Sequence, residues 1–104
     1  MSKKQKKDNV KLVDKQEQKV EPPKKFKVVF YNDDYTPMDF VVLILETVFH
    51  HPAAAAHAIM LDVHNKGKGV AGVYSKEIAE TKAHMVNETA ANYGHPLMAQ
   101  FEPE

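Results

Sequence analysis

The 104-residue sequence predicts an α+β domain with the element order β-α-α-β-α-β, in which a small three-stranded antiparallel sheet packs against three helices. Short runs with aromatic and β-branched residues, or with alternating apolar positions, recur three times and are typical of strands. Longer segments with apolar residues at helical spacing lie between them. Hydrophobic residues make up 43% of the chain, as in ordinary globular proteins. Length and composition therefore favour one small folded domain.

The first 24 residues predict a flexible, disordered basic extension rather than part of the domain. Residues 1–25 contain nine lysines and four acidic residues, whereas residues 26–104 contain five lysines and ten acidic residues. A segment with so few apolar residues cannot offset its ordering entropy by burial. Pro22 and Pro23 mark the edge of the folded body, which we expect to span residues 25–104. The extension is either a passive solubilising tail or an arm that another protein grips.

The first strand is expected at residues 26–31, because aromatic and β-branched residues fill this run. A helix follows at residues 38–50 and is apolar around most of its circumference, so we expect it to be largely buried. Pro52 disfavours helix in the residue before it and suits the first turn of a second helix. This second helix should run to about residue 65, with Gly67 as its C-terminal cap.

The junction between the first strand and the first helix, residues 32–34, has the sequence Asn-Asp-Asp. Thr36 is the expected N-cap of the helix, with Pro37 as the first helical residue and Asp39 as the third, which approximates a capping box. Asn and Asp commonly form simple turns. A junction of this kind also often carries binding groups on a rigid frame, so both interpretations stay open.

The second half of the chain supplies the remaining elements. Residues 68–74 are expected to form a strand, and Ser75 can cap a third helix at residues 76–93 that Gly94 ends. Residues 97–101 alternate apolar and other side chains and are expected to form the last strand. The order of these segments gives the predicted α+β architecture.

Several functional classes are disfavoured by what the sequence lacks. It has no cysteine, which fits a reducing compartment, so we expect a cytoplasmic protein. It has no apolar run long enough for a membrane span and no secretory signal, so we expect no membrane partner. All fourteen basic residues are lysine, and the absence of arginine disfavours nucleic-acid binding. The six histidines match no metal-binding motif, and no nucleophile or phosphate-binding motif is present, so we expect no metal, no cofactor and no enzyme activity.

One group of residues suits a binding site. Asn32, Asp33 and His64 can each present a hydrogen-bond acceptor, and a primary ammonium group has three donors and no acceptor. Apolar side chains that could surround these acceptors are those of Met38, Val41, Met60, Val63 and Leu97. An acceptor rim beside an apolar pit would bind a protein's amino terminus followed by a large hydrophobic side chain. The ordinary alternative is a satisfied helix histidine and methionines that belong to the core.

Four segments of the sequence are recognisable in order and at fitting spacing. They are residues 29–41 (Val-Phe-Tyr-Asn-Asp-Asp-Tyr-Thr-Pro-Met-Asp-Phe-Val), residues 60–69 (Met-Leu-Asp-Val-His-Asn-Lys-Gly-Lys-Gly), residues 79–82 (Ala-Glu-Thr-Lys) and residues 95–97 (His-Pro-Leu). Together they resemble the signature of the ClpS family of bacterial adaptor proteins. The resemblance runs from about residue 24 to residue 102, which is nearly the whole predicted domain. Residues 50–56, from His50 through the alanine run, depart from the more charged sequence expected there.

The resemblance implies a function that spacing alone does not show. Members of this family recognise N-degrons, which are substrates with an N-terminal Phe, Tyr, Trp or Leu, and deliver them to the AAA+ unfoldase ClpA for degradation by the peptidase ClpP. At matching positions, the substrate α-ammonium would be bound by Asn32, Asp33 and His64, and the side-chain pocket would be lined by Thr36, Met38, Val41, Met60, Val63 and Leu97.

The resemblance also assigns roles outside the pocket lining. Met38 matches the gatekeeper that disfavours β-branched N-terminal residues, and Glu77 and Lys82 match positions on the unfoldase-facing surface. The basic tail resembles the family's mobile N-terminal extension, whose engagement by the unfoldase accompanies delivery. The alternatives are an interaction module of the same fold without N-degron binding, a nucleic-acid binder that uses the lysine-rich tail, and a metalloenzyme.

Overall fold

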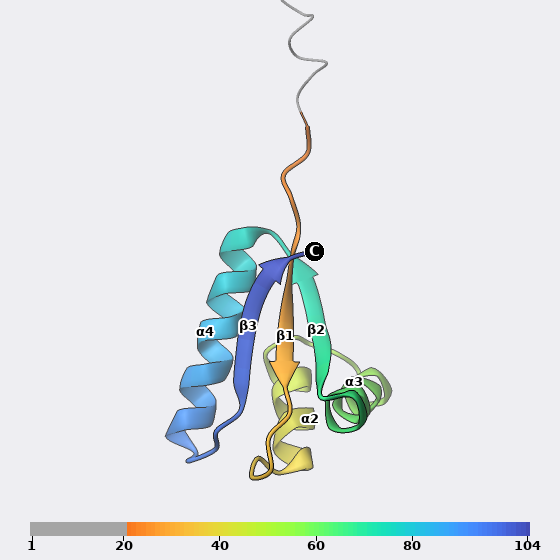
Figure 1. The fold of residues 1–104 in the computed structure, drawn as a ribbon, viewed down its shortest axis with the longest axis vertical. Coiled ribbons are helices and arrows are strands. Elements are labelled where there is room, and N and C mark those ends of the chain that lie inside the picture. Colours follow the sequence, from red (N-terminus) through yellow and green to blue (C-terminus); the bar gives the residue numbers. More distant parts are fainter. Residues whose placement is uncertain (1–20) are drawn as a thin grey trace, which may run out of the picture.

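The computed structural model describes residues 21–104, and its six elements follow the predicted order β-α-α-β-α-β (Figure 1). The predicted fold class is therefore confirmed. The tail predicted as disordered lies outside the described residues up to residue 20, and residues 21–25 are exposed chain without helix or strand. The elements are β1 (Phe26–Tyr31), α2 (Met38–Thr47), α3 (Ala53–Lys66), β2 (Lys68–Tyr74), α4 (Lys76–Asn92) and β3 (Met98–Pro103).

The three strands form one antiparallel sheet in the order β2-β1-β3, so β1 is the central strand. Phe26, the first residue of β1, pairs with Tyr74 at the end of β2 and with Pro103 at the end of β3. Tyr31, the last residue of β1, pairs with the first residues of β2 and β3. The segment that follows β1 therefore leaves the sheet beside the end of α3 and the start of β3.

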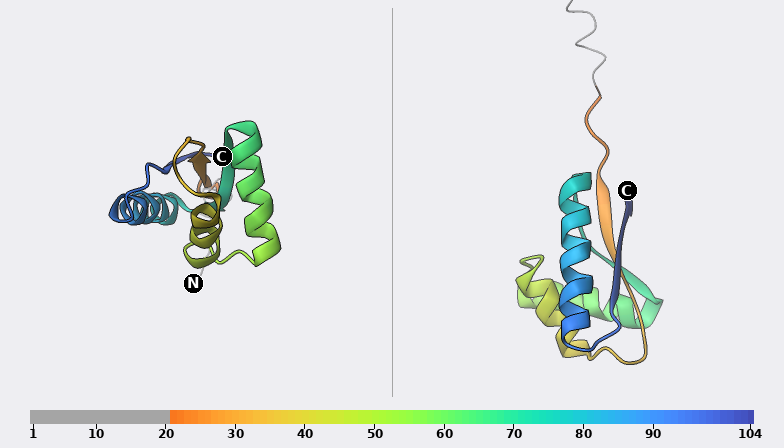
Figure 2. Two further views of the ribbon diagram at one scale, coloured as in Figure 1. Left: turned by 90° about the horizontal axis from the view of Figure 1, so that it is seen from below. Right: turned by 90° about the vertical axis from the view of Figure 1, so that its left-hand side faces the viewer.

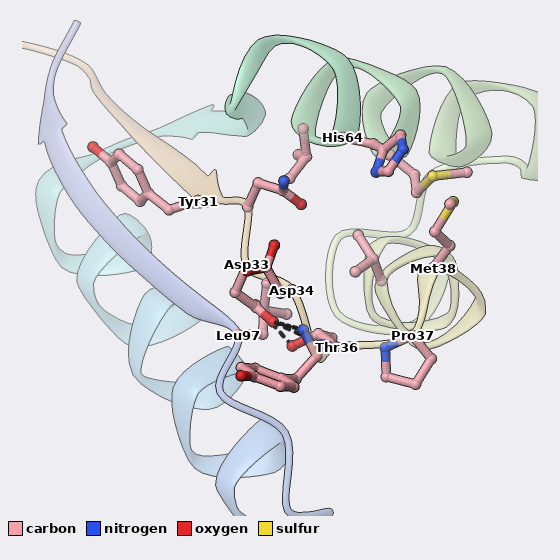
Figure 3. A pocket seen from close by; sticks show the side chains of 13 residues that line it. Tyr31, Asp33, Asp34, Thr36, Pro37, Met38, His64 and Leu97 are labelled. Carbon is pink, nitrogen blue, oxygen red and sulfur yellow. Dashed lines mark hydrogen bonds between the residues drawn. The ribbon is translucent and has the colours of Figure 1, made fainter.

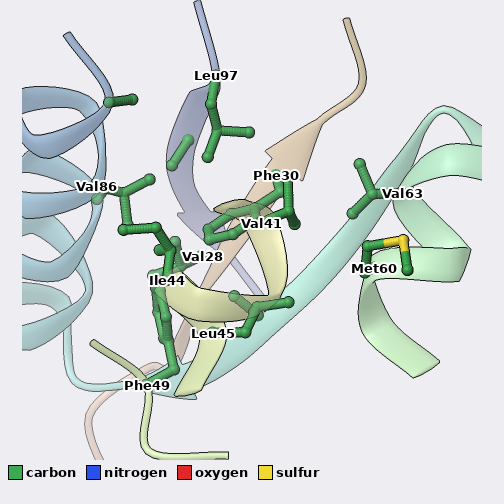
Figure 4. Close-up of a cluster of buried hydrophobic side chains, with 14 of the residues drawn as sticks. Val28, Phe30, Val41, Ile44, Leu45, Phe49, Met60, Val63, Val86 and Leu97 are labelled. Carbon is green, nitrogen blue, oxygen red and sulfur yellow. The ribbon is translucent and has the colours of Figure 1, made fainter. Parts of the chain in front are cut away.

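The core lies between the sheet and the helices. Phe30 of β1 and Leu45 of α2 are fully buried, and Val86 of α4 closes the cluster from the other side (Figure 4). Helix α4 runs alongside β3 and also contacts β1, α3 packs against β2, and α2 packs against α3 (Figure 2). This arrangement holds the start of α2 and the end of α3 near the point where β1 ends.

Helix α2 differs from the sequence prediction at both of its ends. Its N-cap residue is Pro37, with no side-chain capping bond, because the Thr36 hydroxyl donates to the Asp33 carboxylate at 2.8 Å instead. Its last residue is Thr47, three residues before the predicted end. The chain turns at His50, which adopts a left-handed φ of 61°, and the backbone N–H of His51 donates to the Leu45 carbonyl. The predicted capping box and helix length are therefore wrong.

The other element ends lie close to their predicted positions. Gly67 caps α3 with a left-handed φ of 90°, and its N–H donates to the Val63 carbonyl, as its position in the sequence predicts. Ser75 is the N-cap residue of α4 but makes no side-chain capping bond. Helix α4 ends one residue before the predicted Tyr93, and β3 is shifted to residues 98–103.

The outer edge of β3 is protected by one side chain of α4. The Asn87 amide nitrogen donates to the Ala99 carbonyl at 2.9 Å, and the Ala99 N–H donates to the Asn87 amide oxygen at 2.7 Å. Unpaired backbone groups at a sheet edge are a template for pairing with another chain. Asn87 thus replaces the neighbouring strand that β3 lacks on this side.

We expect Asn87→Ala to lower the free energy of unfolding by about 1–3 kcal/mol, because it leaves the two backbone groups of Ala99 without their partner. Urea denaturation of both proteins measures the difference. His84→Ala, on the exposed side of the same helix, is the matched control and is expected to change the free energy little. Equal losses in the two variants would contradict the role of Asn87.

Candidate functional site

A pocket of about 390 Å³ opens where β1 ends, between the start of α2, the second half of α3 and the segment before β3 (Figure 3). The structure brings together all nine residues that the sequence predicted for the ammonium site and the side-chain pocket. The lining residues are Tyr31, Asn32, Asp33, Asp34, Tyr35, Thr36, Pro37, Met38, Val41, Met60, Val63, His64 and Leu97.

The floor of the pocket is apolar and comes from three different segments. Val41 belongs to α2, Met60 and Val63 belong to α3, and Leu97 immediately precedes β3. All four are only 4–6% exposed. The approach of α3 to the sheet depends on Gly69 of β2, because a Cβ there would lie 2.9 Å from a methyl carbon of Val63. The floor is thus a part of the core that remains open at one end.

The rim of the pocket is polar and more accessible to solvent. The backbone N–H of Asn32 donates to the Gly67 carbonyl at 2.9 Å, which ties the end of β1 to the end of α3. His64 lies on the exposed side of α3, above the floor. The side chain of Met38 extends from the start of α2 toward the part of α3 that carries His64 (Figure 3).

Asp33 organises the loop between β1 and α2. One carboxylate oxygen accepts hydrogen bonds from the backbone N–H groups of Tyr35 and Thr36, at 2.8 and 2.7 Å, and the other accepts from the Thr36 hydroxyl. This is the local side-chain-to-backbone bonding by which Asp stabilises turns. A carboxylate has about four acceptor positions, so Asp33 retains capacity for a ligand. The turn and the binding interpretations of this segment are therefore compatible.

The environment of Asp33 favours the ionised carboxylate. Partial burial acts to raise its pKa, but the hydrogen bonds from Thr36 and Tyr35, together with the nearby imidazole of His95, lower the pKa below its ordinary value. The ring of His95 packs edge-on against Phe40 of α2, with 4.6 Å between the ring centroids. The loop therefore carries a fixed negative charge at the pocket at neutral pH.

The lowered pKa of Asp33 predicts a pH dependence of stability. A depressed folded-state pKa adds stability that is fully present above the ordinary value near 3.9 and is lost as the pH falls through the folded-state pKa. We expect the wild type to have a higher free energy of unfolding than Asp33→Asn from about pH 5 to 7. This difference, the gap between the two proteins, should narrow below about pH 4. Urea denaturation across this range measures the gap. A gap that stays constant down to pH 3 would contradict the prediction.

Four lining residues were not predicted as site residues. Asp34, Tyr35 and Pro37 lie within the segment that joins β1 to α2, and Tyr35 is 80% exposed at the rim. Tyr31 is the last residue of β1, and its hydroxyl donates to Glu102 of β3 at 3.0 Å. Its position at the strand end, next to the Asn-Asp-Asp segment, is the signal that could have identified it.

Glu77 and Lys82 lie on α4, away from the pocket lining. Glu77 is exposed in the first turn of the helix. Lys82 is partly buried, because its ammonium group donates to the Val48 carbonyl at 2.7 Å and lies over the rings of Phe49 and Tyr74. Lys82 therefore holds the C-terminal end of α2. A role of either residue in binding an unfoldase stays a prediction.

Within residues 21–104, no three or more histidine or acidic side chains come together in a way that could hold a metal ion. None of the helices here is both long enough and apolar enough to cross a membrane.

The comparison with known families decides the relationship of the chain. The family model described as ATP-dependent Clp protease adaptor protein ClpS matches residues 21–100. The chain belongs to the ClpS family. The match covers the whole sheet except the end of β3, all three helices and every residue that lines the pocket. The predicted family is confirmed, and the protein is an adaptor of the ATP-dependent Clp protease.

Curated ClpS proteins from several bacteria are similar to this chain along most of their length. The ATP-dependent Clp protease adapter protein ClpS of Acetivibrio thermocellus is 60% identical over 82 residues, which is 79% of this chain and 83% of the relative. That of Paraburkholderia phymatum is 50% identical over 97 residues, covering 93% of this chain and 92% of the relative.

A solved ClpS structure has the same fold. The structure of Agrobacterium tumefaciens ClpS2 bound to L-phenylalaninamide superimposes with a TM-score of 0.77 and is 40% identical in sequence. The alignment covers 80% of this chain and 100% of that chain. The fold of that ClpS structure therefore accounts for most of this chain.

Proposed function

We propose that this ClpS-family protein is a cytoplasmic N-degron adaptor. It binds the free α-amino group and the large hydrophobic N-terminal side chain of substrates, which is Leu, Phe, Tyr or Trp, and delivers them to a ClpA-type unfoldase for degradation by ClpP. The observation that carries the proposal is a rim of hydrogen-bond acceptors directly above an apolar floor in one pocket. L-Phenylalaninamide, the ligand of the similar Agrobacterium tumefaciens ClpS2, combines a primary amine with an aromatic side chain.

The rim has the chemistry that an ammonium group requires. An α-ammonium has three donors, and Asn32, Asp33 and His64 offer an amide oxygen, a carboxylate and an imidazole nitrogen as acceptors. The lining of the pocket includes two acidic residues, Asp33 and Asp34, and no lysine. A peptide α-amino group is largely protonated at neutral pH, so this charge distribution favours a free amino terminus.

The floor supplies the second half of the recognition. Burying a Leu or Phe side chain contributes about 1.5–3 kcal/mol. Each charge-assisted hydrogen bond contributes about 1.5–3 kcal/mol, so two or three bonds and one side chain give about 5–12 kcal/mol before ordering costs. A micromolar dissociation constant requires about 8 kcal/mol. Such binding is tight enough to capture a substrate and weak enough to release it to an unfoldase.

The pocket and the surface expected to face the unfoldase lie at opposite ends of the sheet. The pocket lies where β1 ends, whereas residues 21–25 enter β1 at the other end, where the C-terminus also lies (Figure 1). The exposed Glu77 is also near that other end, because α4 begins directly after the end of β2. An unfoldase could therefore contact Glu77 and the N-terminal extension while the pocket holds a substrate.

Fluorescence anisotropy with two labelled peptides tests the proposal. One peptide begins with leucine, and the other is identical but N-acetylated, which removes the positive charge and two of the three donors. We expect micromolar or tighter binding of the free amine and loss of binding on acetylation. Equal binding of both peptides, or binding of neither, would leave an interaction module of the same fold as the better description.

A further inference from the structure

The methionine side chains of this protein differ in access and in location. The sequence has no cysteine, so thioether groups are its only sulfur atoms that an oxidant can reach. Among the described residues, Met38, Met85 and Met98 are 48%, 44% and 48% exposed, whereas Met60 is 5% exposed. Met38 and Met60 line the pocket, and Met85 and Met98 do not. Of the two methionines that line the pocket, Met38 is therefore the one that is open to oxidants in solvent.

The position of Met38 makes its oxidation state relevant to binding. Its side chain extends from α2 toward the part of α3 that carries His64, beside the floor that would hold the substrate's side chain (Figure 3). Oxidation converts a flexible apolar thioether into a polar sulfoxide. A bound substrate side chain would cover the sulfoxide of Met38. A polar group that loses water without gaining a hydrogen bond carries a desolvation cost, and this cost would oppose substrate binding.

We propose that Met38 is a reversible oxidation site through which hydroperoxides weaken the binding of N-terminal residues. A lone pair of the Met38 sulfur attacks one peroxide oxygen, the O–O bond breaks, and an S–O bond forms. With hydrogen peroxide the sulfur is oxidised by two electrons, and the peroxide is reduced to one water molecule. A thiol-dependent methionine sulfoxide reductase reverses the step, with two thiols oxidised to a disulfide and the oxygen released as water. The inference rests on the proposed function.

The same geometry predicts that a bound substrate protects the site. A large N-terminal side chain in the pocket would cover Met38, while Met85 on α4 and Met98 on β3 would stay as exposed as before. An adaptor that already holds a substrate would keep that substrate when hydroperoxides are present, because Met38 is covered. An empty adaptor would be oxidised and would then bind new substrates more weakly. Oxidation would therefore reduce the binding of new substrates and not the transfer of bound substrates to the unfoldase.

The test uses the full chain and hydrogen peroxide. Peptide mapping by mass spectrometry measures the sulfoxide fraction at each methionine, and anisotropy with a leucine peptide that lacks sulfur measures the dissociation constant. We expect oxidation of Met38 to raise the dissociation constant about tenfold and reductase treatment to restore it. A saturating leucine peptide should slow the oxidation of Met38 and leave that of Met85 and Met98 unchanged.

Two variants test whether the rise in the dissociation constant comes from the sulfur of Met38. In Met38→Leu, whatever its own affinity, the dissociation constant should be the same before and after peroxide. In the double variant Met85→Leu with Met98→Leu, the tenfold rise should persist, because those side chains lie outside the pocket lining.

Three results would overturn the inference. They are complete oxidation of Met38 with an unchanged dissociation constant, a rise that persists in Met38→Leu, and oxidation of Met38 that is much slower than that of Met85 and Met98. In each case a wild type that binds the leucine peptide before treatment leaves the proposed function standing. An untreated protein that does not bind this peptide would overturn the proposed function and the inference together.

Discussion

Replacing Asp33 with asparagine is expected to weaken binding of a leucine peptide by about 10- to 100-fold. The carboxylate is held ionised at the pocket rim by hydrogen bonds from the Tyr35 and Thr36 backbone and from the Thr36 hydroxyl. A hydrogen bond to a charged group contributes about 1.5–3 kcal/mol, which corresponds to this range of affinity. The loss should appear for every N-terminal residue, because the α-ammonium is common to all of them.

Asparagine is the informative substitution because it preserves the turn. Its amide oxygen can still accept from the two backbone N–H groups, and its amide nitrogen can donate to the Thr36 hydroxyl. Anisotropy at pH 7 measures the affinity, and circular dichroism verifies the fold. Asp62→Asn removes the same charge from the exposed side of α3, outside the pocket lining, and is expected to leave the affinity unchanged. Equal affinities of the wild type and Asp33→Asn would exclude the carboxylate as an ammonium ligand.

The elements of this fold were predictable because local signals and tertiary packing agree. β1 is aromatic and β-branched, and the structure makes it the central strand with a fully buried Phe30. Gly67 was predictable as a cap because helices commonly end with a residue in the left-handed conformation, which glycine adopts without steric cost. The end of α2 was not predictable from propensity, since the left-handed backbone of His50 is imposed by the turn into α3 rather than favoured by the residue type.

At the site, residue spacing predicted which side chains share a helix face but not which side chains bond to each other. Spacing placed Met60, Val63 and His64 on one face of a helix, and all three line the pocket. Spacing did not reveal that the Thr36 hydroxyl donates to the Asp33 carboxylate and does not cap α2. The Asp33 carboxylate and the first turn of the helix are both within reach of this hydroxyl, and the sequence does not show which of them it contacts. Nor did it reveal that Lys82 bonds the Val48 carbonyl, since those residues lie 34 positions apart and meet only in the packed fold.

Met38→Ala is expected to admit peptides with N-terminal isoleucine or valine and to lower the preference for leucine over isoleucine about tenfold. A β-branched side chain is widest at the carbon next to the backbone, so it would meet the Met38 side chain at the pocket mouth, whereas leucine branches one atom deeper. One misplaced methyl group in an apolar pocket changes affinity by about 1–3 kcal/mol.

The preference is measured as the ratio of the dissociation constants of two peptides that differ only in their first residue. Using the ratio separates selectivity from the general loss of affinity that a smaller side chain at position 38 also causes. Met98→Ala is the matched control, because Met98 is as exposed as Met38 but lies outside the pocket lining, and its ratio should equal that of the wild type. If Met38→Ala also retains the wild-type ratio, the discrimination arises from the buried floor of Val41, Met60, Val63 and Leu97 and not from the mouth of the pocket.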